Sequence, residues 1–301
     1  MARFCQRMAE CWYQAMMQRV ESLIPHSVVQ QAVRAALAED LGRAGDITSQ
    51  ATVPNGLMTQ AHMVARSAGV LAGIDVARAA FLQIDSQLQV TLLANDGQTI
   101  GANTTLMTIR GAAQAILAAE RVALNFVGHM SGIATQTQRF VAAIKPHATQ
   151  VVCTRKTLPN LRVFQKYAIR CGGGFNHRFG LDDAILIKDN HIALAGGVIP
   201  ALRAAKRAAG HLIKIEIEVD TLSQLDEVLA EGVDVVLLDN MSLEQLTLAV
   251  ERTQGRAILE ASGNMTLDRV AAVAATGVDI ISVGALTHSV TNLDIGLDIE
   301  A

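Results

Sequence analysis

Apolar and polar residues alternate in short segments through the first third of the chain. Up to about residue 110, runs with a period of two are separated by glycine-containing turns, a pattern typical of strands. The predicted strands cover 57–66, 88–93 and 104–109. Helical spacing predicts helices over 27–41 and 74–84. Ser27 is the expected N-cap of the first helix, Gly42 its stop, and 45–49 a turn-rich link. Strands with few helices indicate an α+β layer, which we expect to form its own domain.

After Gly111 the pattern changes to longer helical segments and short, fully apolar runs. Helices are predicted over 112–128, 133–144, 198–209, 222–230, 243–252 and 267–275. The apolar runs predict strands near 151–153, 184–187, 213–217, 233–238, 257–259 and 280–283. Buried strands that alternate with helices are parallel, with right-handed crossovers. About six such units fit a small α/β barrel better than the eight-fold form, and an open doubly wound sheet is the alternative.

Composition narrows the class of protein. Half of the 301 residues are hydrophobic but only 3% are aromatic, so the core must consist mainly of aliphatic side chains. The net charge of −3 argues against general nucleic-acid binding. Four cysteines lack the spacing of a zinc site or a disulfide framework, which indicates reduced thiols and a cytoplasmic location. No apolar run reaches about 18 residues, so we expect no membrane span.

The stretch 154–191 concentrates positive charge in an otherwise acidic chain. It contains seven Lys and Arg residues against three Asp, and 172–174 are consecutive glycines. Such a concentration favours an anionic ligand, although a solvated basic helix would show the same count. Arg155 and Lys156 come just after one predicted strand, and Lys188 follows the next. Cations at the ends of buried strands favour a ligand site.

The carboxyl ends of parallel strands meet at one edge of a sheet, where α/β proteins bind their ligands. The predicted ends carry charged residues or glycine turns: Thr154, Arg155, Lys156, Lys188, Glu218, Asp239, Ser262, Gly263, Asn264 and Gly284. Glycine turns before helices offer N–H groups to a phosphate, and simple helix capping is the alternative. Glu218 and Asp239 suit Mg²⁺ bound to substrate phosphates, and a structural role is equally compatible.

Several long motifs lie at these positions. The basic stretch reads T-R-K-T-L-P-N-L-R, G-G-G-F-N-H-R and I-L-I-K-D-N-H, and elsewhere the chain has A-E-R-V-A-L-N, E-V-D, L-L-D-N-M, E-A-S-G-N and I-S-V-G-A-L-T-H-S. With these motifs the chain resembles the quinolinate phosphoribosyltransferases, also called nicotinate-nucleotide pyrophosphorylases (carboxylating). The resemblance covers residues 35–295. We expect 1–20, an amphipathic helix by its spacing, to pack on this protein or on a partner subunit.

The resemblance implies an α/β fold, with an N-terminal α/β sandwich followed by an incomplete six- or seven-stranded α/β barrel. We therefore expect a helical extension at 1–25, a sandwich domain at 26–128 joined by the tail 286–301, and a catalytic barrel at 129–285. The implied assembly is a homodimer whose sites are completed across the interface. The implied reaction joins quinolinate to phosphoribosyl pyrophosphate with Mg²⁺, giving nicotinate mononucleotide, pyrophosphate and CO₂ for NAD biosynthesis.

The family's site residues carry over onto matching positions of this chain. Those implied to bind the pyridine dicarboxylate are Arg155, His177, Arg178, Lys188 and, from the partner chain, Arg121. Those implied to act on the diphosphate, its metal or the ribose hydroxyls are Lys156, Glu218 and Asp239. Those implied to hold the 5′-phosphate are Ser262, Gly263, Asn264, Val283, Gly284, Ala285 and His288. Lys156, Lys188, Glu218 and Asp239 are the expected catalytic residues, with Glu218 and Asp239 holding Mg²⁺ through substrate and water.

Three positions depart from the family pattern. Leu158 and Asn160 stand where a small or hydroxyl residue and Gly are more common, and Phe175 lies in the glycine loop where a less bulky residue is common. These departures leave the loop shape and the direction of Arg162 open.

Three rival functions remain at this point. One is a related protein associated with molybdenum transport, one is an aldolase with Lys188 as Schiff-base nucleophile, and one is a non-catalytic phosphometabolite-binding barrel. The intact His177-Arg178 pair and Arg121 favour quinolinate, because two carboxylates need several cations.

Overall fold

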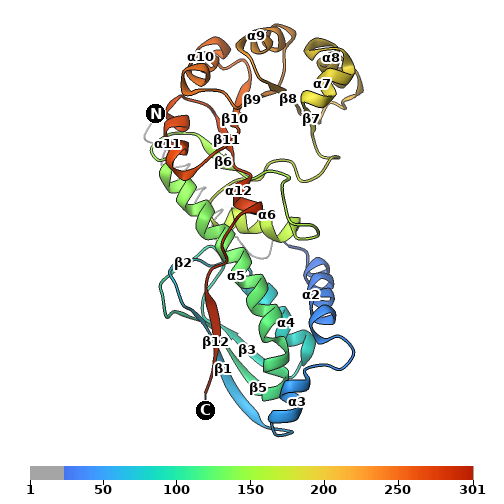
Figure 1. The fold of residues 1–301 in the computed structure, drawn as a ribbon, viewed down its shortest axis with the longest axis vertical. Coiled ribbons are helices and arrows are strands. Elements are labelled where there is room, and N and C mark those ends of the chain that lie inside the picture. Colours follow the sequence, from blue (N-terminus) through green and yellow to red (C-terminus); the bar gives the residue numbers. More distant parts are fainter. Residues whose placement is uncertain (1–23, 301) are drawn as a thin grey trace. The chain divides into compact units, whose positions relative to one another are not determined.

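The computed structural model describes residues 24–300, which divide into two compact units (Figure 1). The first unit contains the chain up to Gln136, the segment Val163–Gly173 and the end of the chain from Val290. The second contains Thr137–Arg162 and Gly174–Ser289. Residues 163–173, which we had assigned to the second domain, thus cluster with the first unit. The predicted helix within 1–20 lies outside the described residues.

The first unit is built on a four-stranded sheet in the order β12-β1-β5-β3. Its strands are β1 (Met58–Ala65), β3 (Gln89–Leu92), β5 (Thr105–Ala112) and β12 (Ile295–Ile299), and β1 pairs antiparallel with both β5 and β12. Ala61, Met63 and Ala65 alternate along β1 and are all fully buried, so the period of two read from the sequence marks the core face.

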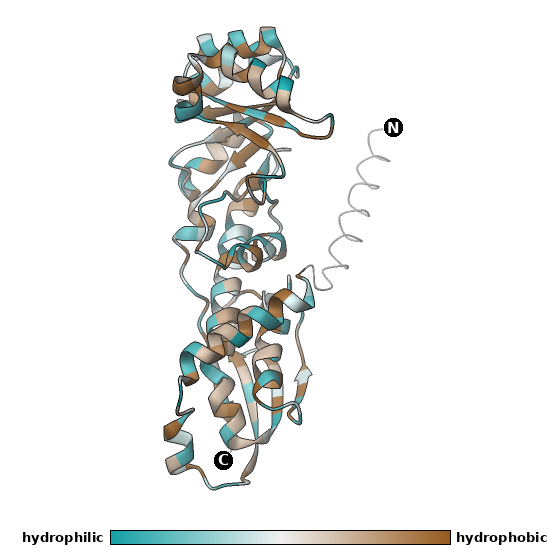
Figure 2. Cartoon of the chain, turned by 90° about the vertical axis from the view of Figure 1, so that its right-hand side faces the viewer, coloured by the Kyte–Doolittle hydropathy of each residue, from teal (hydrophilic) through white to brown (hydrophobic). Residues whose placement is uncertain are grey.

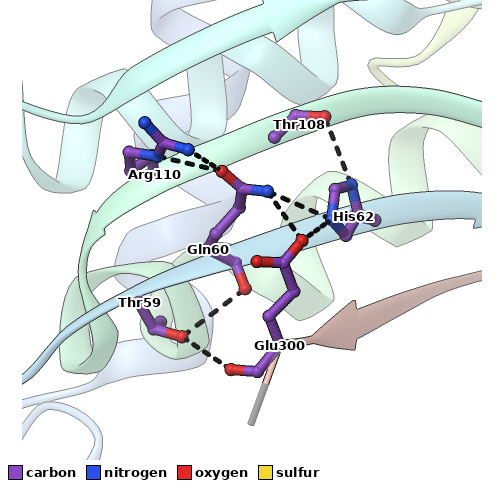
Figure 3. A network of polar contacts seen from close by, with 6 residues as sticks. All are labelled: Thr59, Gln60, His62, Thr108, Arg110 and Glu300. Atoms are coloured by element: carbon purple, nitrogen blue, oxygen red, sulfur yellow. Dashed lines mark hydrogen bonds and ion pairs between the residues drawn. The ribbon is translucent and has the colours of Figure 1, made fainter.

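The other face of this sheet carries a polar network, drawn in Figure 3. Arg110 on β5 donates to Gln60 Oε1 on β1 through Nε at 2.9 Å, and Gln60 Nε2 donates to Glu300 Oε1 at 2.7 Å. His62 Nε2 lies 2.6 Å from the same carboxylate oxygen, and Thr108 Oγ1 lies 3.2 Å from His62 Nδ1. The network joins β1, β5 and the residue after β12 through side chains, in addition to the ladder hydrogen bonds.

The helices of this unit correct three predictions. Its helices are α2 (His26–Leu41), α3 (Ile47–Thr52), α4 (Ile74–Ile84), most of α5 (Ala113–Ala143) and most of α6 (Arg162–Cys171), and β2 (Gly69–Val70) pairs with β4 (Thr99–Ile100). Helix α2 begins after Pro25 without a side-chain cap, so Ser27 is not its N-cap. The expected link over 45–49 contains the start of α3, because Asp46 accepts from the N–H groups of Thr48 and Ser49.

The helices predicted over 112–128 and 133–144 are one continuous helix, α5. Gly128 ends the first predicted range, and Gly132 directly precedes the second. In the structure a Cβ on Gly128 would lie 3.1 Å from the carbonyl oxygen of Leu293, and one on Gly132 would collide with that of Thr291. The glycines therefore allow close approach of the chain before β12, and they do not end the helix.

The second unit is a six-stranded parallel sheet in the order β6-β11-β10-β9-β8-β7. Its strands are β6 (Gln150–Val152), β7 (Ile185–Ile187), β8 (Ile215–Val219), β9 (Val235–Asp239), β10 (Ile258–Ser262) and β11 (Ile280–Ser282). Its helices are α7 (Asp189–Ala195), α8 (Val198–Ala208), α9 (Leu222–Glu231), α10 (Leu243–Thr253), α11 (Leu267–Ala275) and α12 (Ala285–His288). The predicted fold class is confirmed: the protein is an α/β protein, and its second unit is a six-stranded parallel sheet with helices between the strands. The sheet does not close into a full barrel, because β6 and β7 form its two edges.

The two faces of this sheet differ in chemistry. Helices α8, α9 and α10 lie along one side of it (Figure 1). On the face of the sheet toward these helices, Ile217, Val236 and Leu259 are buried. The strands are mostly brown in Figure 2, while the helices carry both colours. The opposite face of the sheet carries Glu216 and Glu260, which are also buried. Carboxylates on a buried face are costly unless they are paired or protonated, so this face is the candidate site.

Among residues 24–300, no helix is both long and apolar enough to cross a lipid bilayer. Cys153 and Cys171 are free thiols buried in the two units, as expected for core residues.

Candidate active site

A pocket of about 290 Å³ lies in the second unit, over the carboxyl ends of the strands. The residues that line it come from β7, β9, β10 and β11, from the segments that follow β6 and β7, and from the loop between α6 and β7: Thr154, Arg155, Lys156, His177, Arg178, Leu186, Lys188, Leu237, Glu260, Ser262 and Ser282. Seven of the predicted site residues are in this set. The sequence did not predict Glu260 or Ser282.

The segment after β6 is fixed by hydrogen bonds on both sides. Lys156 N–H donates to Thr154 Oγ1 at 3.0 Å, and Thr287 Oγ1 donates to the Lys156 carbonyl at 2.7 Å. A Cβ on Gly284 would lie 3.2 Å from both Lys156 Cδ and His288 Nε2. The structure therefore brings Lys156, Gly284 and His288 together.

Arg155 and Arg178 both lie in the pocket wall, close enough for their charges to interact. The Nε atoms of both are buried without a hydrogen-bond partner, although Arg178 Nη1 donates to the Ala184 carbonyl at 2.9 Å. Burial, followed by the Arg155 charge, lowers the pKa of Arg178 from its ordinary value. Two guanidinium groups that repel each other and keep unused donors are suited to binding an anion with several oxygens.

Carboxylates occupy the next part of the edge. Lys188 Nζ donates to Glu218 Oε2 at 2.9 Å. One carboxylate oxygen each of Glu218, Asp220 and Asp239 lies within 4.8 Å of the others, a spacing and donor type that fit a hard divalent cation. Asp220 was not predicted, although E-V-D contains it. Glu218 lies inside β8, because that strand extends two residues beyond its predicted end.

Two tight turns adjoin the pocket after β9 and β10. Gly263 has φ +98°, and a Cβ on it would collide with the Asn240 side chain. Arg269 on α11 donates to the Gly263 carbonyl at 3.1 Å and to the Met241 carbonyl at 2.9 Å. The predicted turn 262–264 is thus packed against the turn after β9 and held by Arg269, which the sequence did not indicate.

His177 is turned toward buried carboxyl groups. Its Nε2 lies 3.0 Å from Glu216 Oε2 and 3.6 Å from Glu260 Oε2. Its Nδ1 accepts from the Arg178 N–H at 2.7 Å. The sequence did not predict Glu216 and Glu260, although the alternation I-E-I-E-V already placed Glu216 on the same face as Glu218.

Two of the three departures from the family pattern have a defined place in the loop structure. Asn160 has φ +63°, a conformation that Asn tolerates better than other non-glycine residues. Phe175 extends the sheet beside β6, donating to the Val151 carbonyl at 2.8 Å. Arg162 donates to Thr157 Oγ1 and to the Phe179 carbonyl, both at 3.0 Å, so it joins two loops.

Arg121 lies in the first unit, exposed on α5, so its predicted role stays a prediction. The same holds for Val283, Ala285 and Asn264, which lie at the predicted turns but do not line the pocket.

Comparison with known proteins gives a consistent result. Residues 46–131 match the family model for the N-terminal domain of quinolinate phosphoribosyl transferase, and residues 133–298 match that for its C-terminal domain. A nicotinate-nucleotide pyrophosphorylase [carboxylating] of Mycobacterium leprae is 49% identical over 89% of this chain and 95% of that protein. A probable enzyme of the same name from Bacillus subtilis is 42% identical over 87% of this chain and 90% of its own length.

Solved structures agree. The nicotinate-nucleotide pyrophosphorylase of Francisella tularensis superposes with a TM-score of 0.88 at 42% identity, covering 92% of this chain and 98% of that one. The family models span both units, and the relatives match over nearly their whole length. On this evidence the chain belongs to the quinolinate phosphoribosyltransferase family.

Proposed function

We propose that this chain transfers the phosphoribosyl group of phosphoribosyl pyrophosphate to the ring nitrogen of quinolinate, with loss of CO₂. The products are nicotinate mononucleotide, which feeds NAD biosynthesis, pyrophosphate and CO₂. The names of the relatives support this reaction. They also separate it from the molybdenum-linked and non-catalytic alternatives, which those names do not describe.

The observation that carries the proposal is the pair Arg155 and Arg178. Both present a buried, unpartnered Nε, and both line a pocket of about 290 Å³ that Lys156 and Lys188 also line. A dianion with two adjacent carboxylates supplies the acceptors that these donors lack. Lys188 serves as a charge for this ligand, and its ion pair with Glu218 offers no support for a Schiff-base nucleophile.

His177 is better placed to support the pocket than to bind the substrate through its ring nitrogens. Nδ1 accepts from the Arg178 N–H and Nε2 faces Glu216. We assign it the role of fixing Arg178 and the carboxyl groups beneath the ligand.

Departure of pyrophosphate develops positive charge at the ribose carbon and negative charge on the leaving group. In this proposal Glu218 and Asp239 favour the first and Lys156 favours the second; the closeness of the two carboxylates and the position of Lys156 in the pocket wall support these roles. The turns at Ser262–Asn264 and Val283–Ala285, with His288, are the proposed cradle of the 5′-phosphate.

The carboxylates Glu218, Asp220 and Asp239 are the proposed Mg²⁺ site. Their oxygens lie within 4.8 Å of one another and are the hard donors that this ion prefers. When bound there with the diphosphate, Mg²⁺ would neutralise part of the leaving group's charge.

We also propose a homodimer in which Arg121 of one chain completes the site of its partner. Its support is the exposure of Arg121 on α5, where no ion pair of the described residues engages it, and the match of its motif to the family.

The test is to incubate the protein with quinolinate, phosphoribosyl pyrophosphate and Mg²⁺ and to follow CO₂ and nicotinate mononucleotide together. Both should appear in equal amounts, and Arg178→Ala should abolish both. Arg252→Ala, which removes an exposed arginine paired with Asp226, is the matched control and should leave the rate unchanged. Absence of both products from the unmodified protein, with phosphoribosyl pyrophosphate still bound, would show that the acceptor is wrong.

A further inference from the structure

Glu260 is a buried carboxyl group that lines the pocket. It lies on β10, two residues before Ser262 and on the same face of the strand, one pleat deeper in the sheet. Only 2% of the residue is exposed to solvent. Its Oε1 is buried without a hydrogen-bond partner, which is rare for a charged oxygen and therefore needs a reason.

The neighbours of Glu260 are acidic or neutral rather than basic. Glu216 on β8 and His177 each place an atom within 4.8 Å of its carboxylate, and the Ser282 hydroxyl on β11 hydrogen-bonds to it. The side chain opposite on β9 is Leu237, which carries no charge. Among the cations, Arg178 is close enough for its charge to act on Glu216.

Two carboxylates this close in a buried site cannot both be ionised, because their repulsion and desolvation are too costly. His177 cannot remove the conflict by becoming doubly protonated without losing the bond in which its Nδ1 accepts from the Arg178 N–H. Its single proton then lies on Nε2, which faces Glu216 at 3.0 Å. The remaining proton of the cluster belongs to Glu260, and burial together with the Glu216 charge raises the pKa of Glu260 to about 7.

The proposed reaction needs a proton at the ring. When the carboxylate next to the ring nitrogen leaves as CO₂, the bonding electron pair stays on the ring carbon, and a C–H bond must replace the lost C–C bond. The ring nitrogen accepts this charge best after it has gained the ribosyl group and become positive, so transfer precedes CO₂ loss. Arg155 and Arg178 are poor proton donors, because a guanidinium group holds its protons too tightly, and Lys188 Nζ already donates to Glu218 Oε2.

We propose that Glu260 is the acid that protonates the ring carbon after CO₂ departs. This assignment rests on the proposed function. The C–C bond breaks, the electron pair on the ring carbon takes the proton of the Glu260 carboxyl group, and Glu260 is left as a carboxylate. It regains a proton from solvent when the product leaves through the open side of the pocket. No other reactant is required.

The test compares Glu260→Gln with the unmodified protein, measuring release of pyrophosphate and of CO₂ from the same reaction. Glutamine keeps the size and a hydrogen-bond donor but has no proton to transfer. We expect CO₂ release to fall about 100-fold, the lower end of the usual contribution of a general acid. Pyrophosphate release in the first turnover should stay within a few-fold, so that a mononucleotide retaining both carboxylates accumulates. Glu231→Gln, at the end of α9 and outside the pocket, is the control and should change neither rate.

Equal falls in both releases, or no fall in either, would overturn the assignment while leaving the proposed function intact. Lack of both products with the unmodified protein would instead contradict the proposed function. A fall of CO₂ release that added Zn²⁺ or Mn²⁺ reverses would also overturn it, because His177, Glu216 and Glu260 would then be metal ligands. If Glu260→Gln does not fold, the unmodified protein still decides: CO₂ release should decline above about pH 7 while pyrophosphate release in the first turnover does not.

Discussion

Lys188 Nζ lies 2.9 Å from Glu218 Oε2, so the residue that follows β7 is paired with a carboxylate on the neighbouring strand. The lysine side chain is 49% exposed, whereas that of Glu218 is 10% exposed. Lys188 lines the pocket with Arg155 and Arg178, and Glu218 belongs to the carboxylate cluster, so the pair joins the two parts. It couples the proposed dicarboxylate site to the proposed metal site.

Lys188→Met should affect the two ligands in opposite directions. Loss of a charge-assisted hydrogen bond costs about 1.5–3 kcal/mol, so the KM for quinolinate should rise about 10- to 100-fold. Glu218, freed from its cation, should bind Mg²⁺ more tightly, so half-maximal activity should need less Mg²⁺. Steady-state kinetics with each ligand varied in turn measure both effects.

Lys214→Met is the matched control, because Lys214 makes a similar 2.8 Å ion pair with Asp234 but does not line the pocket. It should change neither constant. A greater Mg²⁺ requirement in Lys188→Met would contradict the coupling of the two sites.

The sequence predicted most strands of the second unit to within two or three residues, because runs of buried aliphatic residues leave few alternatives. It could not place Glu216 and Glu260, since a carboxylate in an apolar run is uninformative until the facing strand is known. The break predicted between 128 and 133 was wrong for a related reason: the sequence shows that Gly128 and Gly132 lack side chains, and only the fold shows that the segment before β12 approaches there. The turn held by Arg269 likewise depends on two loops far apart in the chain.

Asn160 offers a test of the loop before α6. Its φ of +63° is a left-handed conformation that costs about 1–2 kcal/mol for most L-residues and little for Gly. Asn160→Gly should leave activity and the unfolding temperature close to those of the unmodified protein. Asn160→Val should lower the unfolding temperature by several degrees and reduce activity, because Arg162 and Arg155 are held by the same loop. The measurements are the unfolding temperature and the activity of each variant. Equal values for Asn160→Gly and Asn160→Val would contradict the left-handed conformation as the reason for Asn160.

Gly263 offers a test of the proposed phosphate turn. Gly263→Ala adds a methyl group that collides with Asn240 at a φ of +98°. The turn must shift, so the KM for phosphoribosyl pyrophosphate should rise at least tenfold while that for quinolinate changes less. Gly255→Ala is the control for backbone strain without a steric collision. Gly255 also has a positive φ, of +71°, but no atom lies within 4 Å of the added carbon. It should lower stability slightly and leave both KM values unchanged.

The raised pKa of Glu260 predicts how stability depends on pH. Burial and the Glu216 charge raise the pKa of Glu260 from an ordinary 4.5 to about 7, so the folded state binds this proton more tightly than the unfolded state does. The resulting stabilisation is fully present below about pH 4.5 and is lost as the pH rises through about 7. Between these values the free energy of unfolding should fall with rising pH, by a total on the order of a few kcal/mol, since one pKa unit corresponds to about 1.4 kcal/mol.

Glu260→Gln should remove this component, so the measurement is the difference in free energy of unfolding between the two proteins at several pH values. The difference is required because His129, whose pKa burial lowers, contributes with the opposite sign near neutral pH in both proteins. Glu260→Gln should be relatively more stable at pH 7.5 than at pH 5.5, because the unmodified protein must then either ionise a second buried carboxyl group or retain its proton at a cost. A difference that is constant across this range would mean that Glu260 is already ionised at pH 5.5, and Glu260 would then have no proton to deliver to the ring.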